Sequence, residues 1–540
     1  MGDTPPCLIT LAPRSSRILK AHCPLPYLLS LLSGVSLAVS WLMPGEGPCA
    51  ALGWIAVILF ILSLENPSQL SQSARGGTTQ PLRCISTPYR LCWIAGITAI
   101  AIAFSWLART IAIFSGLPSS AAVAVFCLFV AGSALQFPLT FWCAIRLPPW
   151  FHRHGLAYPL GWIAGEMVSP RIFPWHLGHT QLAVRSFALA ASLAGAGLLS
   201  FVMVWVSSSL VIAITRRSYR PLLASLLVLG AAIGYGTTER IRYQRVNHPT
   251  ISVALIQANV SLEHKHDISY FETNVDSYRS LSDAVPESTE LVIWPESVIQ
   301  RFIPDSIISS THSRFLPPPL PDRDLLVGSL TFTSDRRPRN SALVIREDGS
   351  IPPIYHKQIL MPFGEYTPFG EFLPWIAQLN DRVANFAAGT GPIVIPLSST
   401  PTAKLAPLIC YEDTVPSLSR EAVRAGATLL ASLSNDAWFG DSVASDQHEL
   451  IAAFRAIETR RTLLRSTNTG TTGIIDPIGN SLGRLPPFSE GVLSAAVPIV
   501  ADIDTPFSRY WGEWPTRILG WATFLWGVWT AMLRRPKVNS

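Results

Sequence analysis

The sequence predicts two unlike parts, a multi-pass α-helical membrane bundle with eight spans and an α/β domain inserted before the last span. Charged residues make up 14% of the 540 residues, against about 25% in an ordinary soluble protein. Hydrophobic residues reach 49%, and the mean hydropathy is +0.33. This composition excludes a disordered chain. The formal net charge of +6 is a sum over two unlike halves, so we do not expect a nucleic-acid partner.

The acidic residues are concentrated in the second part of the chain. Between residues 21 and 236 the only ones are Glu46, Glu65 and Glu166, and nearly all the others follow residue 237. A change in composition this sharp indicates a domain boundary.

Apolar runs long enough to cross a hydrocarbon core of about 30 Å mark the expected spans. One run is weak, Leu156–Val168, and it contains Glu166. We interpret this carboxylate as satisfied by a neighbour such as Arg171, with a functional role as the alternative. The strong runs are Tyr27–Met43, Cys49–Leu64, Leu91–Leu107, Ala121–Ile145, Phe187–Ile214, Leu222–Tyr235 and Ile518–Leu533.

Loop charges predict the orientation, because cytoplasmic loops carry an excess of Lys and Arg. With the N-terminus inside, the short outside loops hold only Arg109, Arg171 and Arg185. This arrangement requires an odd number of spans before residue 237. The weak run Leu156–Val168 is therefore counted as a span, which gives seven. The expected organisation is a cytoplasmic tail at 1–20, a seven-span membrane domain at 21–236, a linker at 237–249, an extracytoplasmic domain at 250–505, a transmembrane helix at 516–534 and a tail at 535–540.

Short apolar runs alternate with helical stretches between about Ile251 and Val500, which is typical of an α/β layer fold. A long loop with apolar content is expected at Glu371–Gly391. The expected strands are Ile251–Gln257, Glu290–Trp294, Asp324–Leu330, Ser341–Arg346, Lys404–Ile409, Thr428–Leu433 and Gly473–Asp476, and the expected helices are Ile268–Ala284, Ser417–Ala425 and Ser445–Leu464.

Cysteine placement is the most informative local signal. Seven of the eight cysteines precede the α/β domain, and Cys410 is the only one within it. It has no disulfide partner there, although an extracytoplasmic compartment favours disulfides. Such a thiol is either an inert side chain at the end of an apolar strand or a nucleophile.

The surrounding residues favour the nucleophile. Cys410 ends the expected strand Lys404–Ile409, and Glu296 follows the apolar run Leu291–Trp294 in the same way. Ligands of open α/β sheets bind at the carboxyl ends of strands. A thiol needs a base to accept its proton and a positive group where an oxyanion forms, and Glu296 and Lys357 supply these chemistries.

Other candidates are weaker. His264 and His266 lack a second ligand pair at zinc spacing, so we expect no metal. No Gly-rich phosphate loop is visible, and we expect no cofactor. Asp436 and His448 are the residues that could complete a Cys–His pair with the thiol. We expect His448 to open the helix Glu449–Leu464 instead. Trp438 and Phe439 are expected in loop packing or acyl-chain contacts.

These motifs together resemble a known family. The nitrilase superfamily has a Glu–Lys–Cys triad, which this chain resembles in Trp294-Pro295-Glu296, His356-Lys357 and Cys410-Tyr411-Glu412. Other segments of this chain resemble the bacterial apolipoprotein N-acyltransferase family. In the α/β half they are Pro362-Phe363-Gly364-Glu365-Tyr366 and Ser434-Asn435-Asp436-Ala437-Trp438-Phe439-Gly440. In the membrane half they are Trp162, Glu166 and Phe173-Pro174-Trp175. The chain departs from the family pattern after Gln257-Ala258-Asn259. The family usually continues with Gln and then Lys-Trp, and this chain has Leu262 and Lys265-His266 at those places.

The resemblance implies an αββα nitrilase-like sandwich in the periplasm and a multi-pass protein of the bacterial inner membrane. It implies an acyl chain transferred from a phospholipid, preferentially phosphatidylethanolamine, through a thioester on Cys410. The acceptor would be the α-amine of the N-terminal S-diacylglyceryl cysteine of an apolipoprotein, in the last step of lipoprotein maturation.

The resemblance also implies roles for individual residues. Glu296 would be the base, Lys357 the oxyanion group, and Glu365, Tyr411 and Glu412 supporting residues, with Glu412 orienting Lys357. We expect a monomer. A membrane-tethered amidase with the same triad and a non-enzymatic transporter are the alternatives.

Overall fold

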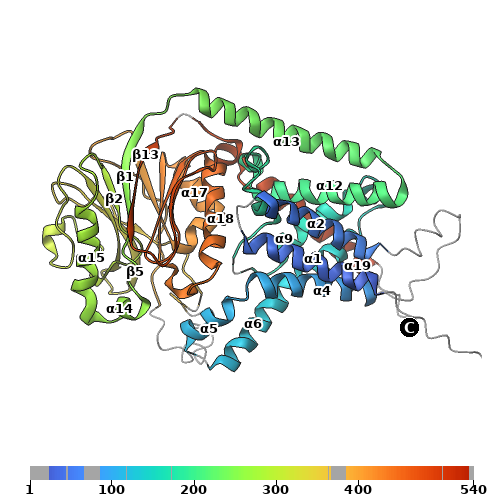
Figure 1. The fold of residues 1–540 in the computed structure, drawn as a ribbon, viewed down its shortest axis with the longest axis horizontal. Coiled ribbons are helices and arrows are strands. Elements are labelled where there is room, and N and C mark those ends of the chain that lie inside the picture. The colour runs from blue at the N-terminus through green and yellow to red at the C-terminus, as the bar shows by residue number, and fades with distance from the viewer. Residues whose placement is uncertain are drawn as a thin grey trace, which may run out of the picture.

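The computed structural model describes residues 24–43, 47–65, 86–116, 118–171, 173–362, 364–366, 385–501 and 503–533. The expected tails at 1–20 and 535–540, and most of the expected loop at Glu371–Gly391, lie outside these residues. Figure 1 shows a helical bundle beside a layered α/β domain, with the long helix α13 (Arg220–Arg245) running along the bundle toward that domain.

The bundle contains the apolar helices that the hydropathy predicts. Five described helices are long and apolar enough to cross a membrane, or six if a pair bent by 57° counts as one span. The expected count of eight stays a prediction, since the weak span is the 12-residue helix α9, about 18 Å long. The main helices are α1 (Leu25–Leu42), α2 (Gly47–Leu64), α4 (Ser86–Ala103), α5 (Leu107–Ser115), α6 (Ser119–Ala134), α7 (Gln136–Ala144), α9 (Ala157–Val168), α12 (Ala196–Arg216) and α19 (Trp514–Leu533).

One expected span begins later than its apolar run. The run Phe187–Ile214 is divided among α10 (Arg185–Ala188), α11 (Ala191–Ala194) and nearly all of α12. Gly195, with φ of 81°, interrupts the helix before α12 begins. Residues 237–245, expected as part of a linker, continue α13.

The α/β domain has two sheets, and each is described by its order of hydrogen-bonded strands. The first has the order β13-β1-β2-β4-β5-β6 with β3 also on β4, and the second has the order β12-β11-β10-β9-β8-β7. The first sheet comprises β1 (Thr250–Gln257), β2 (Leu291–Ile293), β3 (Ile299–Pro304), β4 (Asp324–Phe332), β5 (Pro338–Ile345), β6 (Tyr355–His356) and β13 (Gly491–Pro498). The second comprises β7 (Ile395–Pro396), β8 (Lys404–Ile409), β9 (Leu429–Ser434), β10 (Thr462–Thr467), β11 (Thr472–Ile475) and β12 (Ser481–Leu485).

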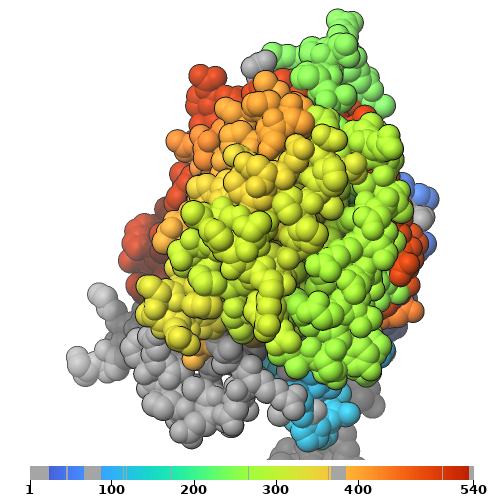
Figure 2. Space-filling model, turned by 90° about the vertical axis from the view of Figure 1, so that its left-hand side faces the viewer, coloured from blue at the N-terminus to red at the C-terminus, as the bar shows by residue number. Residues whose placement is uncertain are grey.

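Three apolar layers hold the sandwich together. Residues such as Leu255, Ile293, Leu405 and Leu429 are fully buried between the sheets. Helix α15 (Phe271–Asp283) packs on the outer face of the first sheet, on the side that Figure 2 shows. Helices α17 (Pro416–Arg424) and α18 (Ala444–Thr459) cover the second sheet. This is the expected αββα arrangement.

The expected helix Ser445–Leu464 is wrong at its C-terminal end. Helix α18 stops at Thr459, Arg460 adopts a left-handed φ of 55°, and β10 follows from Thr462. Strand β10 pairs in parallel with β9 along its six residues, and all six are buried. Its burial on both faces removes the alternation that would distinguish it from a continuing helix. Strands β3, β6, β7, β12 and β13 were also not expected.

Helix α18 lies between the second sheet and the membrane bundle. Its Gln447 is buried, accepts a hydrogen bond from Trp106 Nε1 at 3.0 Å, and donates to the carbonyl oxygens of Trp41 at 3.1 Å and Ala103 at 2.9 Å. One amide therefore joins α18, which covers the second sheet, to α1, the end of α4 and the segment before α5.

Replacing Gln447 by Leu should lower the thermal unfolding midpoint of the detergent-purified protein by several degrees. The indole N–H of Trp106 loses its buried acceptor, at a cost of about 1–3 kcal/mol. Tryptophan fluorescence during heating measures the midpoint, and Gln244→Leu, at an exposed position on α13, is the matched control. Equal midpoints for the two variants would contradict this role of Gln447.

Candidate active site

Cys410 lies at the carboxyl end of β8, at the start of the short helix η4 (Cys410–Thr414). Its backbone has a φ of 53°, a left-handed conformation that non-glycine residues rarely adopt and that is frequent at functional sites. Burial and the carboxylate of Glu296 raise the pKa of its thiol, whereas Lys357 lowers it. The thiol therefore needs a base close by to become a nucleophile.

Glu296 follows β2 in a turn that leaves no room for a side chain beneath it. A Cβ on Gly328 would lie 2.4 Å from the oxygen of Pro295 and 2.7 Å from Cα of Glu296. The carboxylate is buried and accepts a hydrogen bond from Asn340 Nδ2 at 2.8 Å. A fixed turn and a side-chain donor together hold Glu296 in one position.

Lys357 follows β6, and its ammonium is almost fully buried, with 2% of the residue exposed. Its Nζ lies 2.9 Å from the carboxylate of Glu365 and 3.7 Å from Oε1 of Glu296. Burial alone would lower the pKa of Lys357, but Glu365, Glu296 and Cys410 outweigh burial and raise it. Lys357 is therefore a permanent positive charge between two acids and a thiol.

Glu365 is the supporting carboxylate of this group. Besides Lys357 it accepts hydrogen bonds from Asn340 Nδ2 at 3.0 Å and from the backbone N–H of Met361 at 2.8 Å. Asn340 thus bridges Glu365 and Glu296, a role that the sequence did not suggest.

Glu412 holds the segment directly after Lys357 and also interacts with the charge of Lys357; that it orients this lysine stays a prediction. It is fully buried and accepts hydrogen bonds from the N–H groups of Gln358 at 2.6 Å, Ile359 at 3.1 Å and Ile409 at 2.8 Å, and from Tyr355 Oη at 2.8 Å. These bonds fasten the segment after Lys357 to the strand that carries Cys410.

Tyr411 points toward the membrane half. Its ring centroid lies 6.2 Å from that of Phe173, which lies 6.3 Å from Phe439 and 5.8 Å from Trp106. Trp106 and Phe439 are 5.1 Å apart. We call these four residues the aromatic row; it extends from beside the thiol to the membrane helices and agrees with the packing expected for Phe439.

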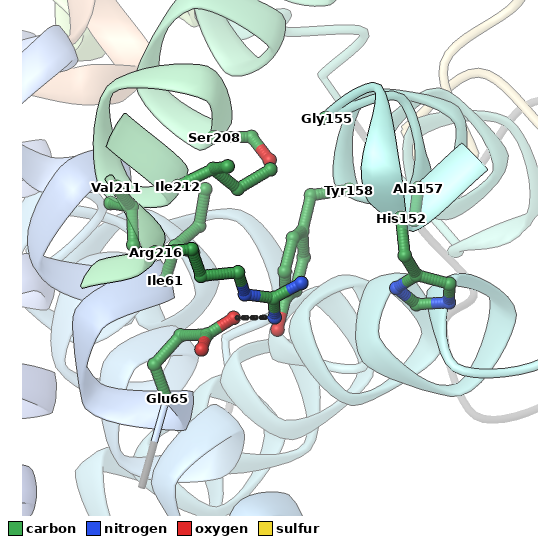
Figure 3. Close-up of a pocket in the computed structure, with 10 residues that line it drawn as sticks. All are labelled: Ile61, Glu65, His152, Gly155, Ala157, Tyr158, Ser208, Val211, Ile212 and Arg216. Atoms are coloured by element: carbon green, nitrogen blue, oxygen red, sulfur yellow. Dashed lines mark hydrogen bonds and ion pairs between the residues drawn. The ribbon is translucent and has the colours of Figure 1, made fainter. Parts of the chain in front are cut away.

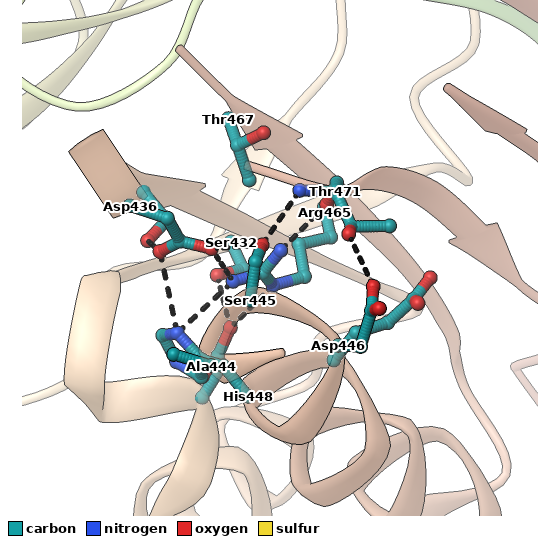
Figure 4. A network of polar contacts seen from close by, with 12 residues as sticks. Ser432, Asp436, Ala444, Ser445, Asp446, His448, Arg465, Thr467 and Thr471 are labelled. Atoms are coloured by element: carbon teal, nitrogen blue, oxygen red, sulfur yellow. Dashed lines mark hydrogen bonds and ion pairs between the residues drawn. The ribbon is translucent and has the colours of Figure 1, made fainter. Parts of the chain in front are cut away.

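A buried charged cluster lies behind the thiol, seen in part in Figure 4. His448 Nε2 is 2.7 Å from Asp413, Arg465 is 2.9 Å from Asp436 and 3.3 Å from Asp413, and Ser434 Oγ donates to Asp436 at 2.8 Å. Ser434 also hydrogen-bonds Cys410, which links the cluster to the thiol.

The position expected for His448 was wrong, because it lies inside α18 instead of opening a helix. Burial and Arg465 oppose its protonation, but Asp413 and Asp436 outweigh them and raise the pKa of His448 to about 9. With His448 protonated, the two carboxylates, the guanidinium and the imidazolium sum to zero charge, which makes complete burial tolerable. An arginine inside an apolar strand was the available sequence signal.

Two polar groups of the bundle are separate from this site. Glu166 binds His176 Nδ1 at 2.6 Å, Trp162 Nε1 at 2.8 Å and the N–H of Leu177 at 3.1 Å, whereas Arg171, the partner we expected, contacts Gln136 at 2.6 Å. Figure 3 shows the second group, a pocket that contains the Glu65–Arg216 pair at 3.2 Å and is lined by Ile61, Glu65, His152, Gly155, Ala157, Tyr158, Ser208, Val211, Ile212 and Arg216.

Within the described ranges, no three His, Cys, Asp or Glu residues come together in a way that could hold a metal ion.

Comparison with known proteins defines the class first. Residues 252–501, almost the whole sandwich, match the carbon-nitrogen hydrolase family. Among solved structures, a nitrilase-superfamily protein of Saccharomyces cerevisiae has 18% identity and a TM-score of 0.36, covering 46% of this chain and 90% of that one.

The similarity to whole proteins extends into the membrane half. Apolipoprotein N-acyltransferase of Geobacter metallireducens is 30% identical over 502 residues, which are 90% of this chain and 91% of that protein. The Azotobacter vinelandii protein of the same name is 31% identical over 466 residues, 82% of this chain and 86% of its own.

The chain therefore belongs to the apolipoprotein N-acyltransferase family, as its motifs predicted. It is an enzyme, an acyltransferase that N-acylates lipoproteins during their maturation. This class of enzyme implies a lipoprotein acceptor and a phospholipid donor. The amidase and transporter alternatives are not favoured by these relatives.

Replacing His448 by Gln should remove a pH dependence of stability. A histidine whose folded pKa is raised from 6.5 to about 9 stabilises the fold fully below pH 6.5, and this stabilisation is lost as the pH rises toward 9. The contribution is up to about 3 kcal/mol. Thermal unfolding midpoints at pH 6.5 and 9 should differ less in this variant than in the unsubstituted protein. His312→Gln, at an exposed histidine, should keep the original difference.

Proposed function

We propose that Glu296, Lys357 and Cys410 form the catalytic triad of this acyltransferase, with Glu365, Tyr411 and Glu412 in supporting positions. The observation that carries the proposal is the position of Lys357, whose ammonium lies 2.9 Å from Glu365 and 3.7 Å from Glu296. The same ammonium lowers the pKa of the Cys410 thiol, which burial raises. A base, a cation and a thiol at one point match the requirements of covalent acyl transfer.

In the first half-reaction, Glu296 accepts the proton of the Cys410 thiol, and the sulfur attacks the ester carbonyl of a phospholipid. Lys357 and the backbone N–H of Tyr411 stabilise the oxyanion that forms. The C–O bond then breaks, and the alcohol oxygen of the lysophospholipid receives the proton from Glu296. An acyl thioester on Cys410 remains.

In the second half-reaction, the α-amine of the N-terminal S-diacylglyceryl cysteine of an apolipoprotein attacks the thioester. Glu296 accepts a proton from the attacking nitrogen and returns one to the leaving sulfur, so the thiol is restored and an amide is released. Phosphatidylethanolamine is the proposed acyl donor, and the enzyme acts as a monomer.

The membrane half supports this assignment through its contacts with the site. Both substrates are anchored in the bilayer, and the aromatic row joins Tyr411 to the helical bundle. We propose that the bundle, at 21–236 with a last helix at 516–534, lies in the bacterial inner membrane. The catalytic domain at 250–505 then faces the periplasm.

Incubating the purified protein with phosphatidylethanolamine should add the mass of one acyl chain to Cys410. Hydroxylamine at neutral pH should release it, as expected for a thioester. Cys410→Ser should show no hydroxylamine-labile mass gain, and Cys127→Ser, at an exposed cysteine of α6, should react as the unsubstituted protein does. An acyl mass that persists on another residue in Cys410→Ala would exclude the mechanism.

A membrane-impermeant maleimide tests the orientation. Glu347→Cys, at an exposed position of the sandwich, should be labelled in intact spheroplasts, whereas Arg217→Cys, after α12, should be labelled only after permeabilisation. The unsubstituted protein gives the background. The reverse pattern would place the catalytic domain in the cytoplasm and contradict the proposal.

A further inference from the structure

Lys265 is a second buried lysine at the active site, and no step described above uses it. It belongs to the short helix α14 (Leu262–His266), which begins after Ser261, whose side chain accepts a hydrogen bond from the N–H of His264. Only 5% of Lys265 is exposed. Its Nζ donates a hydrogen bond of 2.7 Å to the backbone carbonyl oxygen of Glu296.

The partner of this ammonium differs from that of a structural ion pair. Lys357 lies against two carboxylates, whereas Lys265 donates its hydrogen bond to a neutral carbonyl group. Burial lowers the pKa of Lys265 to about 8, although Glu296 and Cys410 act in the opposite direction. The charge of Lys265 therefore interacts with Glu296, the proposed base, and with Cys410, the proposed nucleophile.

The turn around Glu296 gives that hydrogen bond a mechanical role. Ser297, the next residue, has a left-handed φ of 50°, and Gly328 packs against the turn from below. Asn340 holds the carboxylate of Glu296 and Lys265 holds its main chain. The two donors together fix both ends of the residue that must accept the thiol proton.

We infer that Lys265 is a positioning residue for Glu296 and a second positive charge that stabilises the Cys410 thiolate during acylation. When the proton moves from Sγ to the Glu296 carboxylate, Glu296 becomes neutral and the negative charge moves to sulfur. Lys265 and Lys357 both attract that charge. The inference rests on the proposed roles of Glu296 and Cys410.

The first test is the pH dependence of acylation by the full-length enzyme in mixed micelles of detergent and phosphatidylethanolamine. Lys265→Met should lower the single-turnover rate constant for thioester formation about tenfold or more, without changing the KM for phospholipid. Lys265→Arg should retain activity and move the alkaline decline of the unsubstituted enzyme, expected near pH 8, to higher pH. Lys404→Met, at an exposed lysine of β8, is the matched control.

A second measurement needs neither a phospholipid nor a working transfer reaction. The rate at which iodoacetamide alkylates Cys410 reports its thiolate fraction. Lys265→Met should slow this alkylation several-fold at pH 8, whereas Lys404→Met should not. An unfolding midpoint close to that of the unsubstituted protein confirms that Lys265→Met is folded. If Lys265→Met does not fold, Lys265→Gln is used in its place.

The outcomes separate the two proposals. If Lys265→Met acylates and alkylates at the unsubstituted rates with the same alkaline decline, the role of Lys265 is refuted. If the unsubstituted protein forms no thioester but Lys265→Met still slows alkylation of Cys410, the proposed function fails and the electrostatic role of Lys265 stands. A rise in KM alone would make Lys265 a substrate-binding residue and overturn the positioning role.

Discussion

The ammonium of Lys357, held between Glu365 and Glu296, is the interaction on which the rest of the site depends. A buried charge is tolerated only with opposite charges and hydrogen bonds around it. The structure meets this demand with segments far apart in sequence, because Glu296 follows β2, Lys357 follows β6 and Glu365 lies in a later loop. The strand order of the first sheet brings the ends of β2 and β6 together, so this sheet sets the position of the cation.

A second set of buried charges, behind the thiol, is also surrounded by opposite charges and hydrogen bonds. Asp413, Asp436, His448 and Arg465 are each almost completely buried, and their charges cancel when the imidazole is protonated. Removing one member would leave an uncompensated charge in the interior. The cluster therefore holds η4, the end of β9 and α18 in a single arrangement, and the thiol is attached to that arrangement through Ser434.

Part of the site could be predicted because two of the three catalytic candidates, Glu296 and Cys410, follow recognisable apolar runs. Cys410 and Glu296 were found as polar residues directly after strands, and β8 has the predicted bounds. Strand β10 was hidden because all its residues are buried, so no periodicity separates it from α18. The role of His448 also could not be read from the sequence, since its partners Asp413 and Arg465 come from other elements.

Lys265 and Asn340 show a different limit. Both act on Glu296, but one lies in a five-residue helix after β1 and the other in β5. Nothing in their immediate neighbours indicates a ligand or a charge partner. Sequence patterns identify where a strand ends. Which side chains from other elements meet at that end depends on the order of the strands in the sheet and on their register.

The aromatic row joins the segment that carries Cys410 to the helical bundle. Tyr411 is bonded to Cys410 through the main chain, and its ring packs on Phe173, which packs on Trp106 at the bend between α4 and α5. The row ends one residue from Cys410, so a change in the tilt of α4 and α5 would act on the segment next to the thiol. Hydrophobic thickness is a property of the surrounding lipids that alters helix tilt. If the bundle lies in a bilayer as proposed, the thickness of that bilayer bears on the segment that carries Cys410.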